Sequence, residues 1–127
     1  MDPALPVRLA TRDEEGARIV TLRVSEDHAC FAGHFSGRPI VPGVVLLHWA
    51  VTELARWQER ALEIAELEAL KFRRPLLPGE TFDLRLAPAS AAKSFSFEMF
   101  DAAGPICSGR IREHTRDLEQ TRVRGGA

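Results

Sequence analysis

One histidine lies in a stretch rich in glycine and proline that runs directly into the most apolar segment of the chain. Residues 33–44 read GHFSGRPIVPGV, and the histidine is His34. A second histidine, His48, follows inside the apolar run that begins at Val44. An imidazole has an unperturbed pKa of about 6.5, so it can take or give a proton near neutral pH. The two histidines are therefore the first candidates for acid and base chemistry.

A helix is predicted from Pro42 to about Gln58, which places His48 within it. Proline fits a first helical position because the N–H it lacks would have no partner there. Residues 44–51 are almost all apolar, a pattern typical of a helix that is buried on every side. A second loop, residues 73–80, carries the prolines and glycine of RRPLLPGE.

Most of the remaining chain alternates between apolar and polar residues, as strands do. Strands are predicted over residues 18–24, 66–72, 81–86, 94–100 and 105–113, with a hairpin turn at 101–104. Residues 1–16 are polar and are expected to be a loose N-terminal segment, and the tail over 115–127 is expected to fray.

This order predicts a single α+β domain over residues 1–127, in which a curved antiparallel sheet wraps around one long central helix. Any part of the helix or of the sheet edge that stays uncovered would then need a second subunit. We therefore expect a dimer.

Composition excludes several classes of protein. The chain has 127 residues, with 17 basic and 18 acidic side chains and a net charge of −1, which argues against nucleic-acid binding. No apolar run approaches the roughly 18 residues of a membrane span, and residues 1–16 do not resemble a signal peptide. Cys30 and Cys107 lack metal-ligand spacing, so we expect reduced thiols in a cytoplasmic protein, without a metal or a redox cofactor.

Two motifs together, GHFSGRPIVPGV and KFRRPLLPGE over residues 71–80, resemble the β-hydroxyacyl-acyl carrier protein dehydratases, which have the hotdog fold. The resemblance covers roughly residues 18–113. It implies an enzyme that removes water from 3-hydroxyacyl thioesters and gives 2-enoyl thioesters, in the synthesis of fatty acids or polyene lipids. The substrate would be carried by acyl carrier protein or by coenzyme A. The resemblance also implies a homodimer, or a higher oligomer, with the active site between two subunits.

By this resemblance, His34 takes the α-proton and the Gly43 N–H holds the thioester carbonyl. The first N–H groups of a helix have no partner within the helix and lie at the positive end of its dipole, which suits a developing enolate oxygen. The acid that protonates the leaving hydroxyl falls on position 48, where the family has a carboxylate and this chain has His48. In this respect the chain resembles aryl-polyene-type dehydratases more than the housekeeping enzymes. Two close imidazoles repel when both are charged, so a neutral His34 beside a protonated His48 would supply base and acid.

The neighbouring apolar side chains complete the predicted site. We expect five residues to bind substrate, namely Phe35, Val44, Trp49, Phe72 and Arg74. Glu53 does not substitute for the missing carboxylate, since five helical residues turn it about 140° away from His48.

Three alternatives stay open. His48 can instead be a neutral residue of the core, hydrogen-bonded to a carbonyl. The basic residues Arg38, Lys71, Arg73 and Arg74 are either a solvated surface or a contact for the acidic carrier protein. Finally, the protein can be an acyl-thioester hydrolase on the same fold, or a catalytically silent acyl-binding subunit that pairs with an active dehydratase.

Overall fold

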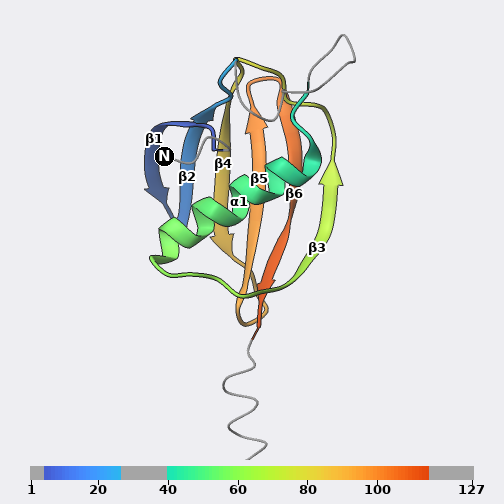
Figure 1. Ribbon diagram of the computed structural model, residues 1–127. Helices are drawn as coiled ribbons and strands as arrows, with labels where there is room; N and C mark the ends of the chain where they lie inside the picture. Colours follow the sequence, from blue (N-terminus) through green and yellow to red (C-terminus); the bar gives the residue numbers. More distant parts are fainter. Residues whose placement is uncertain (1–4, 27–39, 115–127) are drawn as a thin grey trace, which may run out of the picture.

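The computed structural model describes residues 5–26 and 40–114, which form six strands and one helix (Figure 1). In chain order these are β1 (Val7–Glu14), β2 (Ala17–Arg23), α1 (Gly43–Gln58), β3 (Ile64–Phe72), β4 (Thr81–Pro88), β5 (Ser94–Asp101) and β6 (Gly104–Glu113). Five of the strands and the helix coincide with predicted elements to within about two residues. The expected fraying of residues 115–127 lies outside the described residues.

All six strands form one antiparallel sheet in the order β1-β2-β4-β5-β6-β3. Three hairpins account for most neighbours, while α1 and β3 are inserted in the chain between β2 and β4. Strand β3 returns to the opposite end of the sheet and has β6 as its neighbour there. Its pairing contains a bulge between Glu68 and Lys71, where Ala69 has a φ of 53°.

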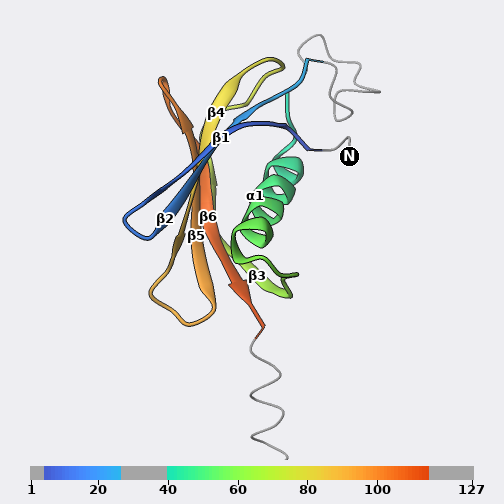
Figure 2. The ribbon, with the colours of Figure 1, turned by 90° about the vertical axis from the view of Figure 1, so that its left-hand side faces the viewer.

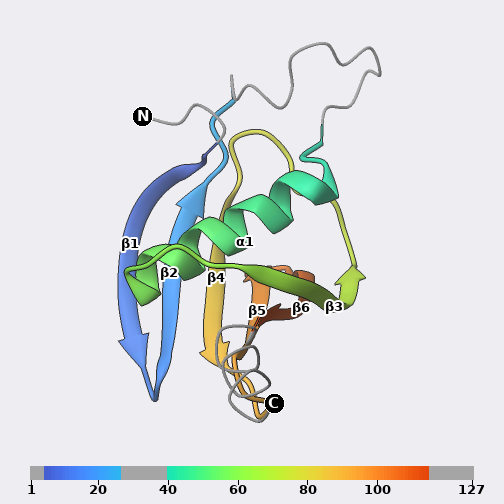
Figure 3. The same cartoon turned by 60° about the horizontal axis from the view of Figure 1, so that its bottom comes forward.

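The helix packs on one face of this sheet (Figure 2). It runs obliquely across the strands, from the side of β3 and β6 at its beginning to the side of β1 at its end (Figure 3). Along the described chain, α1 is neither long enough nor apolar enough to cross a membrane.

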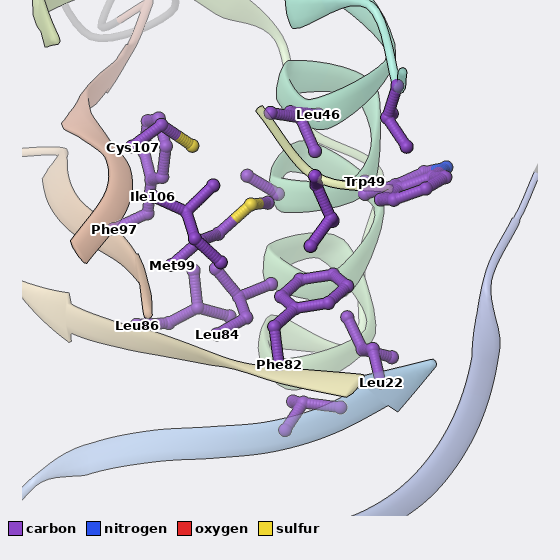
Figure 4. Packing of buried hydrophobic residues seen from close by; sticks show 14 of the residues in the cluster. Leu22, Leu46, Trp49, Phe82, Leu84, Leu86, Phe97, Met99, Ile106 and Cys107 are labelled. Carbon is purple, nitrogen blue, oxygen red and sulfur yellow. The ribbon is translucent and has the colours of Figure 1, made fainter. Parts of the chain in front are cut away.

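The core lies between α1 and the sheet (Figure 4). Alternate residues of β4 point inward, and Phe82, Leu84 and Leu86 are almost completely buried. Trp49 of the helix is fully buried and stacks on Phe82, with ring centroids 6.1 Å apart. Large aromatic and aliphatic side chains of this kind contribute most of the free energy of folding.

Two buried carboxylates fasten the helical segment to distant strands. Glu53 of α1 is 4% exposed and accepts a hydrogen bond of 3.1 Å from Nε of Arg8 in β1. Glu113 of β6 is 3% exposed and accepts two hydrogen bonds of 2.7 Å from Arg60, just after the helix. The Arg60 guanidinium lowers the pKa of Glu113 below its ordinary value by hydrogen bonding to the carboxylate.

The prediction of a loose segment over residues 1–16 is wrong for residues 7–14, which form strand β1. Every residue of β1 is exposed, so burial leaves no alternating pattern in its sequence. The strand is specified instead by its turn, because Glu15 and Gly16 have φ values of 49° and 82° and Glu14 pairs with Ala17. Two successive positive φ values define the type I′ turn that joins antiparallel strands, a turn that Glu-Gly signals less clearly than Asn-Gly.

The prediction that α1 is buried on every side is also wrong for the single chain. The sheet covers one face, on which Leu46, Trp49, Ala50, Glu53 and Leu54 are buried. On the outward face Val44 is 72% exposed and His48 is exposed as well. One sheet can cover only one side of a helix, so the outward apolar residues face solvent here.

Candidate active site

The helix begins at Gly43, directly after Pro42 in extended conformation. The Pro42 carbonyl accepts hydrogen bonds from the N–H groups of Val45 and Leu46, at 3.0 and 3.2 Å. The N–H groups of Gly43 and Val44 come before Val45 and Leu46, the first donors of the helix, so neither has a partner within the helix. The first turn also contains no acidic side chain. The beginning of α1 is therefore an electropositive end with outward-pointing N–H donors.

The ring of Phe72 lies against this helix start. A Cβ atom built on Gly43 would lie 3.0 Å from Cε1 of Phe72 and 3.1 Å from its Cζ. Glycine at position 43 therefore permits an approach that any larger residue would obstruct. Phe72 is 52% exposed and Val44 is 72% exposed, so apolar surface surrounds the exposed N–H groups.

The backbone brings the two sequence motifs together at this point. The N–H of Val41, before the helix, donates a 2.9 Å hydrogen bond to the carbonyl of Leu76 in the second loop. The N–H of Arg73 donates a 2.8 Å hydrogen bond to Ile106 of β6, which fixes the chain directly after Phe72. The described end of the first motif and the second motif thus lie side by side.

The structure places His48 on the outward face of α1, one turn beyond Val44. The alternative of a core histidine is therefore wrong for the single chain, because the side chain is exposed. His48 lines an open groove of about 610 Å³ together with Val51, Thr52 and Ala55. These helical residues were not singled out from the sequence. Their spacing of three, four and seven from His48 is the pattern that would have identified them.

Gly43, Val44, Phe72 and His48 thus lie along one accessible side of the molecule. Glu53 lies on the inward face, as its spacing from His48 predicted, and its carboxylate is bonded to Arg8. His34 and Phe35 lie outside the described residues. The roles of all these residues in chemistry stay predictions.

Two expected substrate-binding residues lie elsewhere. Trp49 is 0% exposed and belongs to the core, because it lies one position beyond His48 and faces the sheet. Arg74 forms an ion pair with Asp101 and donates a 3.2 Å hydrogen bond to the Gly104 carbonyl. This hydrogen bonding raises the pKa of Arg74 and lowers that of Asp101. Arg74 therefore fastens the second loop to the turn between β5 and β6, where its guanidinium is already engaged.

A curved antiparallel sheet packed on a single helix, with a glycine at the exposed start of that helix, is a hotdog fold of the kind found in thioester dehydratases. A solved structure described as the dehydratase heterocomplex ApeI:P from Xenorhabdus doucetiae superposes with a TM-score of 0.76 at 22% identity, covering 85% of this chain and 96% of that chain.

Residues 10–110 match the ApeI-like family, described as ApeI dehydratase, and the chain belongs to this family. Among curated proteins, it is 32% identical to the 3-hydroxyacyl-[acyl-carrier-protein] dehydratase FabZ of Haemophilus influenzae (strain PittEE) over 71 residues, 50% of this chain and 48% of that protein. It is also 32% identical to FabZ of Mannheimia succiniciproducens over 91 residues, 65% of this chain and 61% of that protein. The chain thus spans about half to three fifths of the length of these relatives.

Proposed function

We propose that this protein removes water from 3-hydroxyacyl thioesters, giving 2-enoyl thioesters for the synthesis of fatty acids or polyene lipids. Membership of the ApeI-like dehydratase family supports this reaction, as do the names of the curated relatives. The proposed substrate is an acyl group on acyl carrier protein, with acyl-CoA as the alternative thioester. We also propose a cytoplasmic location, which the free thiol of Cys107 supports.

The observation that carries the proposal is an exposed imidazole at His48, on the same side as the N–H groups that begin α1. The two positions are five residues apart, or about 7.5 Å along the helix axis. A thioester whose carbonyl oxygen accepts the Gly43 N–H can therefore extend along the helix toward His48. Phe72 and Val44 supply apolar surface for the acyl chain beside it.

The proposed reaction needs three groups. His34 takes the proton from the α-carbon, and negative charge develops on the thioester oxygen, where the Gly43 N–H stabilises it. The carbon–carbon double bond forms as the bond between C3 and its oxygen breaks. His48 gives a proton to the departing hydroxyl, which leaves as water.

We propose that the functional unit is a homodimer, in which one subunit supplies His34 and the other supplies His48. Two features of the described chain support a second copy. Strand β3 is at the end of the sheet and has β6 as its single neighbour. The outward side of α1 also carries the apolar side chain of Val44, which is 72% exposed.

A second candidate function is that of a silent subunit that pairs with an active dehydratase. The observation that favours it is His48 itself, because it stands where the resemblance places a carboxylate. The similar ApeI structure, moreover, is described as a heterocomplex.

The test is to incubate the purified protein with short and long 3-hydroxyacyl thioesters and to measure enoyl products by mass spectrometry. We expect turnover by the wild type, loss of turnover in His34→Ala, and retained or higher turnover in His48→Glu, with His48→Gln strongly impaired. Val51→Ala, in the same groove as His48 but without an ionisable group, is the matched control and should stay active. Turnover by His34→Ala at the wild-type rate would exclude the assigned base. An inactive wild type that becomes active when produced together with a related dehydratase would support the silent-subunit function instead.

A further inference from the structure

The face of the sheet opposite α1 contains a second hollow that the proposed reaction does not use. It has a volume of about 380 Å³ and spans β3, β4, β5 and β6. Its charged lining consists of four cationic side chains and one carboxylate, namely Lys71, Arg73, Arg85, Arg110 and Glu98. Figure 2 shows that no described element covers this face.

The positive charge in this hollow is weakly compensated. Over residues 5–26 and 40–114, no carboxylate forms an ion pair with Lys71, Arg73 or Arg85. Arg110 reaches Glu68 at 3.8 Å, a loose contact between an exposed cation and a half-buried carboxylate. The whole chain has a net charge of −1, so this cluster is a local concentration of positive charge. Such a concentration attracts acidic partners and raises their rate of association.

The hollow and the proposed active site lie on opposite faces of the sheet and share the end of β3. Phe72 pairs with Cys107 on the inner face, and its ring meets Gly43. Lys71 and Arg73 flank Phe72 in the chain, and Lys71 pairs with Ser108 on the outer face. A partner bound to the outer face is therefore next to the strand end that borders the helix start.

We propose that this cationic hollow is the docking surface for an acidic carrier protein, which presents the acyl group at the adjacent helix start. This inference rests on the proposed function. The four cations come from the end of β3, from β4 and from β6, and they are spread over a shallow face of the sheet, so they do not converge on one point. Convergent donors suit a single phosphate, whereas a spread of flexible cations suits the broad acidic surface of a folded partner.

The experiment compares one 3-hydroxyacyl group on two carriers, an acidic acyl carrier protein and the small thiol N-acetylcysteamine. In the double variant Arg85→Glu/Arg110→Glu, we expect KM for the carrier-protein substrate to rise about tenfold or more at low salt, because like charges now face the partner. Its kcat should stay unchanged, as should kcat/KM for the small thioester. The matched control is Arg12→Glu/Arg23→Glu on the β1–β2 hairpin, which changes the net charge equally and should behave like the wild type.

Three results would overturn the docking surface. They are an equal rise of KM in the control, an equal loss with the small thioester, and a KM that does not depend on salt. If the wild type turns over neither substrate, the proposed function fails, and binding of acyl-free carrier protein, measured by calorimetry, still decides the docking surface. The neutral variant Arg85→Gln/Arg110→Gln is measured alongside and should show a smaller rise of KM, which keeps the test valid if the charge reversals unfold the protein.

Discussion

Removal of the Arg60 guanidinium should destabilise the protein more than removal of an arginine whose carboxylate partner is exposed. The Glu113 carboxylate is 3% exposed and accepts both of its 2.7 Å hydrogen bonds from Arg60. Substitution Arg60→Met keeps most of the aliphatic stem and leaves the buried carboxylate without its cation. The expected change is a loss of folding free energy caused by one unpaired charge.

The magnitude follows from the exposure of the two partners. Breaking a fully buried ion pair by removing one partner costs about 3–5 kcal/mol. The side chain of Arg60 is 41% exposed, so water screens part of the interaction. We therefore expect Arg60→Met to lower the free energy of unfolding by about 2–3 kcal/mol at pH 7.

The loss should depend on pH in a defined direction. Because hydrogen bonding to Arg60 lowers the pKa of folded Glu113, its contribution to stability is fully present above the unfolded value of about 4.3. That contribution disappears as the pH falls through the lower pKa of the folded state. Without Arg60, burial opposes ionisation of Glu113 and only the charge of Lys93 favours it, so protonation relieves the penalty. The difference between wild type and Arg60→Met should therefore shrink as the pH falls from 7 toward 4.

Urea unfolding followed by tryptophan fluorescence measures this difference, since Trp49 and Trp57 report on the helix. The control is Arg18→Met, which removes a cation paired with the exposed Asp13 at 2.9 Å and should cost far less. A loss in Arg60→Met no larger than in the control would refute this reasoning. A loss that stays constant with pH would show that packing rather than charge is responsible.

Three further outcomes are expected. Trp49→Ala should destabilise the protein by about 3–5 kcal/mol in urea unfolding, because it empties a fully buried site, whereas Val44→Ala should stay near the wild type. The Cys107 thiol, whose pKa is raised to about 12 by burial, should resist iodoacetamide at pH 8 in the folded protein and react in urea, as peptide mass mapping would detect. Gly43→Ala should fold normally but displace the Phe72 ring and lower kcat/KM. Phe72→Leu in the same chain should restore part of the lost kcat/KM. An unchanged kcat/KM in Gly43→Ala would contradict the role of this close approach.

Strands with one buried face were predictable because their side chains alternate, as at Phe82, Leu84 and Leu86. Strand β1 could not be predicted in this way, because all of its residues are exposed. Its position follows from a turn and from backbone pairing. The helix was predictable from its apolar run. The extent to which one chain covers the helix could not be predicted, because an apolar residue gives the same signal whether its own sheet or another subunit covers it.

The candidate site was likewise predictable in part. Gly43, Val44 and Phe72 were identified from two motifs, and the backbone hydrogen bond from Val41 to Leu76 brings these motifs together. Trp49 and Arg74 belong to the same stretches of sequence, yet one faces the core and the other is bonded to Asp101. A motif indicates which segments meet, whereas the direction of each side chain depends on helical phase and on nearby charges.

The irregularity at Ala69 has a consequence for how these molecules behave when concentrated. A straight edge strand with unpaired backbone donors and acceptors can pair with further strands without limit, as in fibres. The extra residue bends and twists this edge strand locally, so a flat strand from an arbitrary protein matches it poorly. The kink thus disfavours open-ended addition of further strands along this edge of the sheet.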